Sequence, residues 1–74
     1  MGEELNMTPK RLELLAAVAE GRVSWNASNA RYILDGQEAN GPDHRALSTM
    51  ARHGWILRAG AVVKLTTAGS QARN

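Results

Sequence analysis

Four polar side chains in the second half of the chain have types and a spacing that suit a binding surface. Counted from Arg45, the other three follow at three, four and seven positions; they are Ser48, Thr49 and Arg52. A helix would therefore place all four on one face. Guanidinium groups offer forked hydrogen-bond donors, and hydroxyl groups both donate and accept. The chemistry expected of such a face is the binding of an external partner rich in acceptor oxygens.

The element needed to present this face is a helix over residues 42–53. Pro42 suits the first helical position, and Asp43 complements the positive end of the helix dipole. Gly54 follows as a residue that can end the helix. The side opposite the polar face carries apolar residues that can pack on a core, namely Leu47, Met50 and Ala51.

The charge of the chain is unevenly distributed along its 74 residues. Residues 1–40 hold four basic and six acidic side chains, whereas residues 41–74 hold five basic side chains and one acidic one. Such a separation is typical of proteins that contact nucleic-acid phosphates. A chain of this length forms one domain with a small core, and without cysteine it has neither disulfides nor a thiolate metal site.

The remaining elements follow from capping residues and turn signals. Thr8, Pro9 and Gly21 predict a helix from about residue 9 to residue 20. Residues 55–65 predict two short strands that meet at Ala59 and Gly60. Thr66 or Thr67 can then cap a last, frayed helical turn.

Residues 22–41 allow two interpretations. In the first, a strand over 23–25 and a strand over 30–34 form a hairpin around the turn "NASN". In the second, Ser28 caps a short helix that ends at "DG" and precedes the helix over 42–53. We favour the hairpin because Trp25, Tyr32 and Ile33 prefer strands.

Several classes of protein are not expected from this sequence. His44 and His53 lie nine positions apart, too far for a same-face metal pair, so we expect no metal site. No catalytic triad, glycine-rich phosphate loop or paired-acid motif is present, so we expect neither an enzyme nor a cofactor. No apolar run approaches the ~20 residues that cross a bilayer, and no signal peptide is visible. We therefore expect a cytoplasmic protein without membrane contact.

The stretch "HGWILRAGAVVKLTTAG" resembles the winged helix signature. In that signature a recognition helix ends at a glycine, an aromatic or aliphatic residue opens a strand, and the second strand closes on residues equivalent to Leu65, Thr66 and Gly69. The chain is most similar to MarR-like and PadR-like domains and to short single-domain winged helix proteins of actinobacteria and their phages. The resemblance implies a small α+β winged helix domain over residues 8–70, with tails over 1–7 and 71–74.

The resemblance also implies a function and a set of contacts. Helix 42–53 would enter the major groove of double-stranded DNA, and the 55–65 hairpin would be the wing. The protein would then be a transcriptional regulator or a recombination accessory factor in the cytoplasm of a bacterium or a phage-infected host cell. The sequence leaves its oligomeric state open, with a weak homodimer as one option. The residues expected to contact DNA are His44, Arg45, Ser48, Thr49, Arg52, Arg58 and Lys64.

A second hypothesis assigns the same fold to protein binding. A small phage-type winged helix protein could bind a host protein, with the arginine face meeting an acidic partner. In that case Met50 or Trp55 is expected to be exposed as an apolar anchor.

Overall fold

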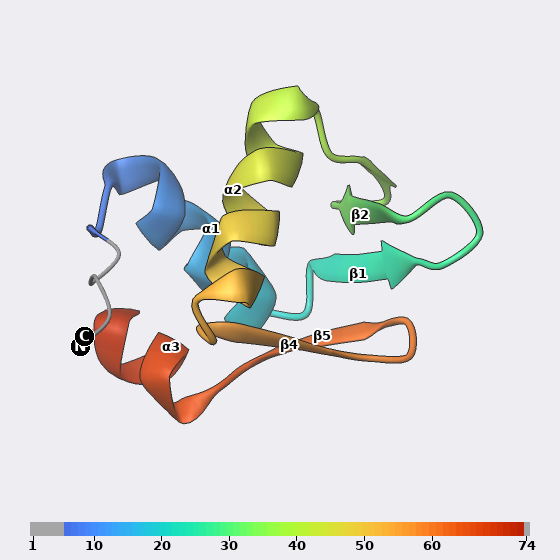
Figure 1. Ribbon diagram of the computed structural model, residues 1–74. Helices are drawn as coiled ribbons and strands as arrows, with labels where there is room; N and C mark the ends of the chain where they lie inside the picture. The colour runs from blue at the N-terminus through green and yellow to red at the C-terminus, as the bar shows by residue number, and fades with distance from the viewer. Residues whose placement is uncertain (1–5, 74) are drawn as a thin grey trace.

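The structure is a computed structural model that describes residues 6–73, and it shows a small α+β fold. Figure 1 shows α1 and α2 on one side of an antiparallel sheet, with α3 beside α1. The elements in chain order are α1 (Pro9–Ala19), β1 (Val23–Asn26), β2 (Arg31–Leu34), β3 (Gln37–Glu38), α2 (Gly41–Arg52), β4 (Ile56–Ala59), β5 (Val62–Leu65) and α3 (Thr67–Arg73).

The sheet has five strands in the order β3, β2, β1, β5, β4, and all neighbours are antiparallel. Two hairpins, β1–β2 and β4–β5, are joined where Ser24 lies opposite Val62. Side chains alternate between the two faces of a sheet, so buried Val23, Tyr32 and Val63 mark the face that the helices cover. The other face carries Leu57 and Val62, which are 57% and 51% exposed.

The core lies between the covered face of the sheet and the inner sides of α1 and α2. Its largest fully buried side chains come from all three of these elements: Tyr32, Leu14, Leu15, Leu47 and Met50. Burial of Leu47 and Met50 confirms the apolar side predicted for the helix over 42–53. Ala51, the third residue of that side, is half-buried and packs against the same cluster.

The caps of the two long helices differ little from those predicted. Thr8 caps α1 by accepting a hydrogen bond from the Arg11 amide at 3.1 Å. The helix α2 begins at Gly41, one residue earlier than predicted, because the Asn40 side chain accepts from the Asp43 amide at 2.8 Å. It ends at Arg52, with His53 as the C-cap.

The hairpin interpretation of residues 22–41 is confirmed, and the helical alternative is wrong. Trp25 pairs with Tyr32 across β1 and β2, with their ring centroids 4.8 Å apart in an edge-to-face arrangement. The chain then turns at Asp35 and Gly36, both of which have positive φ, as a tight two-residue hairpin requires. This turn leads into β3, a strand that was not predicted.

Hydrogen bonds connect the end of the second hairpin to the residues that follow α2. The Thr66 amide donates to the Trp55 carbonyl at 3.0 Å, and the Thr66 hydroxyl donates to the Gly54 carbonyl. The same hydroxyl caps α3 by accepting from the Gly69 amide at 3.0 Å. The helix α3 continues to Arg73, so residues 71–73 are helical and not the tail expected over 71–74. Of the other expected tail, 1–7, residues 1–5 lie outside the described residues.

Within residues 6–73, no helix has the length and apolar character needed to cross a membrane.

Gly69 is expected to be intolerant of a side chain. A Cβ atom at this position would lie 2.0 Å from the Trp55 carbonyl oxygen, a backbone atom that cannot move away freely. We expect Gly69→Ala to lower the free energy of unfolding by about 1–3 kcal/mol, as overpacking of a tight contact does. Thermal or urea denaturation measures this change. Ser70→Ala, at the exposed neighbouring position of α3, is the control and should have little effect; equal stability of the two variants would contradict the assignment.

Candidate functional site

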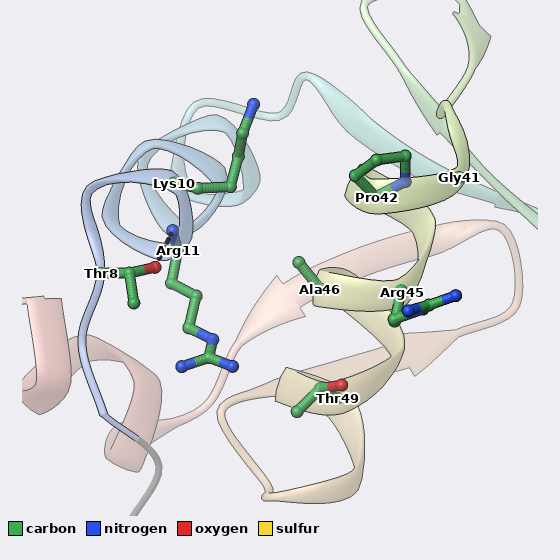
Figure 2. A pocket seen from close by; sticks show the side chains of 8 residues that line it. All are labelled: Thr8, Lys10, Arg11, Gly41, Pro42, Arg45, Ala46 and Thr49. Carbon is green, nitrogen blue, oxygen red and sulfur yellow. Dashed lines mark hydrogen bonds between the residues drawn. The ribbon is translucent and has the colours of Figure 1, made fainter.

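The polar face predicted for the second long helix is present on α2. Arg45 and Arg52 are exposed, and Ser48 and Thr49 are half-buried at the edges of the face. All four lie away from the buried side that carries Leu47 and Met50. Figure 2 shows two members of this set, Arg45 and Thr49, one helical turn apart on α2.

The guanidinium groups of this face are not neutralised within the described part of the chain. No carboxylate of residues 6–73 lies within 4.0 Å of Arg45 or Arg52. Arg22, in contrast, pairs with Glu20 at 2.6 Å and with Asp35 at 2.9 Å. Glu20 and Asp35 therefore balance Arg22 and do not neutralise the guanidinium groups of α2.

His44 lies beside this face and not on it. Its ring is half-buried, with its centroid 5.6 Å from that of Tyr32, so it packs toward the sheet. Its buried Nδ1 has no hydrogen-bond partner among residues 6–73.

The two basic residues of the β4–β5 hairpin point to opposite faces of the sheet. Arg58 lies opposite the buried Val63, on the side that faces the helices, and its guanidinium carbon is 4.0 Å from the centroid of the Trp25 ring. This is the geometry of a cation–π contact. Lys64 lies opposite Leu57, on the uncovered side. The structure thus brings Arg58 to the same side of the sheet as α2 and leaves Lys64 on the other.

Two basic residues near α2 were not recognised from the sequence. Lys10 and Arg11, in the first turn of α1, line a groove of about 460 Å³ with residues of α2 (Figure 2). The full lining is Thr8, Lys10, Arg11, Gly41, Pro42, Arg45, Ala46 and Thr49. Helical spacing places Lys10 and Arg11 on the solvent-facing side of their own helix. No residue close to them in the sequence indicates that α2 packs next to them.

Lys10 also joins the two helices through a buried carboxylate. Its ammonium lies 3.2 Å from Oδ1 of Asp43, whose side chain is only 10% exposed. Glu13 lies 3.5 Å from the same ammonium. Lys10 is therefore balanced by acidic neighbours, unlike Arg45.

The described residues contain no group of three or more His, Asp or Glu side chains placed to hold a metal ion. Comparison with known proteins gives no match to a protein-family model, to a curated protein or to a solved structure.

Tyr32 provides a direct test of the position of Arg58. It is the only tyrosine, and burial raises the pKa of its phenol above 10.0, while the Arg58 charge lowers it. We expect the phenolate absorbance of the folded protein to appear above pH 10, and Arg58→Ala to move the midpoint further upward. Because the folded pKa exceeds the unfolded value, the stability that Tyr32 contributes is present below pH 10 and is lost as the pH rises through the folded pKa.

The control for this titration is Lys64→Ala, which removes a positive charge from the other face of the same hairpin. It should leave the Tyr32 midpoint unchanged. A midpoint that responds equally to both substitutions, or to neither, would show that Arg58 does not lie near the phenol.

Proposed function

We propose that this chain is a small DNA-binding protein of the winged helix type, acting as a transcriptional regulator or a recombination accessory factor. The observation that carries the proposal is the outer face of α2, where two exposed guanidinium groups have no carboxylate partner within residues 6–73. A face of this kind suits a polyanion, since exposed cations without internal partners can release counterions when they meet phosphates.

The dimensions and chemistry of α2 are suitable for the major groove. The groove is about 12 Å wide and admits an α-helix. Arginine can donate two hydrogen bonds to guanine O6 and N7, and hydroxyl groups can bind phosphates or base edges. In the proposed complex, Arg45 and Arg52 contact bases or phosphates, and Ser48 and Thr49 contact the groove edges.

The order of elements after α2 supports the same proposal. The hairpin β4–β5 follows α2 directly and, through β5, pairs with β1, as expected for a wing.

Before α2, the described chain has β2 and β3 where a helix-turn-helix would have its first helix. We propose that the helix α2 enters the groove without that partner helix, braced by the sheet and α1.

The proposal is tested by the double substitution Arg45→Ala with Arg52→Ala. Fluorescence anisotropy with a labelled random-sequence duplex, titrated at several salt concentrations, gives both affinity and its salt dependence. We expect wild-type affinity to fall steeply with salt, and the double variant to bind at least tenfold more weakly, with a salt slope smaller by about 2. The melting temperature should be unchanged, because both side chains are exposed.

Arg31→Ala is the matched control for this test. Arg31 is an exposed arginine of β2, next to Tyr32 and therefore on the sheet face that the helices do not cover. Its loss should change the affinity much less than the loss of the two arginines of α2. Equal effects would mean that DNA responds only to net charge, and would contradict the assigned face.

A protein partner remains the second candidate, but neither expected anchor, Met50 in α2 or Trp55 in the turn after it, is exposed. Met50 is fully buried, and Trp55 is packed against the core. The exposed apolar residues Leu57 and Val62 instead lie on the uncovered sheet face. A protein partner bound there needs no affinity for DNA, so a wild-type protein that does not bind duplex DNA at low salt would favour this second candidate.

A further inference from the structure

The groove between α1 and α2 contains a second cation that is available to a ligand. Arg11 is half-buried, and its Nη1 donates to the Asn6 carbonyl at 2.7 Å. No carboxylate among residues 6–73 lies within 4.0 Å of its guanidinium group. Because only one of its donors is used by the described chain, the remaining N–H groups can serve an external acceptor.

The other side chains of the groove favour an anion as that acceptor. The lining contains three basic residues and two threonines but no acidic residue. Lys10 is neutralised by Asp43 and Glu13, so it contributes little further charge. Figure 2 shows Arg11 extending from α1 into the space beside α2, where Ala46 and Thr49 form the facing wall. The Thr8 hydroxyl already accepts from the Arg11 amide, whereas no hydrogen bond within residues 6–73 involves the Thr49 hydroxyl.

The location of the groove indicates which anion it would meet. Arg45 and Thr49 belong both to the groove lining and to the outer face of α2, so the two surfaces are continuous. A helix in the major groove has a phosphate backbone on each side. Arg58 lies on the side of α2 that faces the sheet, and the groove lies on the side that faces α1.

We propose that this groove binds one phosphodiester group of the DNA strand that runs along the α1 side of α2, with Arg11 as the main ligand and the Thr49 hydroxyl as a second donor. The inference rests on the proposed function. It adds a contact from outside α2 and the wing. Because phosphate contacts are the same for every base sequence, this contact would position the protein on the duplex and would not read bases.

The test is the salt dependence of duplex binding by Arg11→Ala, measured beside the wild type and Arg31→Ala. Loss of one phosphate contact should reduce the slope of log affinity against log salt by about 1, and should weaken binding by the same factor on duplexes of different sequence. Arg11→Lys should keep most of the slope, since it retains the charge. Arg11→Gln is the second neutral variant, and melting temperatures establish that each variant is folded.

The outcomes separate this inference from the proposed function. A reduced slope for Arg11→Ala and Arg11→Gln, with Arg31→Ala close to the wild type, supports the phosphate site. A wild-type slope for folded Arg11→Ala, while Arg45→Ala with Arg52→Ala loses binding, overturns the groove site and leaves the α2 interface in place. A wild-type protein that does not bind duplex DNA at low salt overturns both.

Discussion

The burial of one side of α2 is the constraint on which the rest of the structure depends. Leu47 and Met50 have no exposed surface, and they are packed among residues of α1 and the sheet. Because a helix repeats every 3.6 residues, fixing these two positions also fixes the direction of Arg45 and Arg52. In so small a core, rotation of α2 would expose its largest apolar side chains. The direction of the polar face is therefore set by packing, without any interaction among its own residues.

The position of the β4–β5 hairpin depends on a compact junction after α2. The Trp55 amide donates to the Met50 carbonyl at 2.9 Å, and the Trp55 carbonyl accepts from Thr66 at the end of β5. Gly69 fits against that same carbonyl because it has no Cβ atom. One peptide region thus connects the end of α2, the hairpin and the start of α3. These contacts give a physical reason for Thr66 and Gly69, two of the residues on which the resemblance to the winged helix signature depends.

Local signals in the sequence were sufficient to predict most helices and strands, whereas the contacts between these elements could not be predicted from it. Thr8, Gly21 and the apolar side of α2 act within a few residues, so the two long helices could be predicted from spacing. Residues 22–41 were ambiguous because Ser28 could cap a helix, and only the pairing of Trp25 with Tyr32 decides for strands. The length of α3 and the contact of Lys10 with Asp43 depend on packing between distant segments. For the same reason, no local pattern indicated that Arg11 lies beside α2.

The β4–β5 hairpin shows why residue type alone does not define an interface. Alternation along the strands sends Arg58 and Lys64 to opposite faces, so only one of them can share a surface with α2. Arg58 lies over the Trp25 ring, with its guanidinium carbon 4.0 Å from the ring centroid, and no hydrogen bond within residues 6–73 uses its side-chain N–H donors. The contact with Trp25 restricts the side chain without consuming its donors. A contact of Arg58 with a phosphate would therefore cost less conformational entropy than one made by Lys64, which is exposed and has no ion-pair partner within residues 6–73.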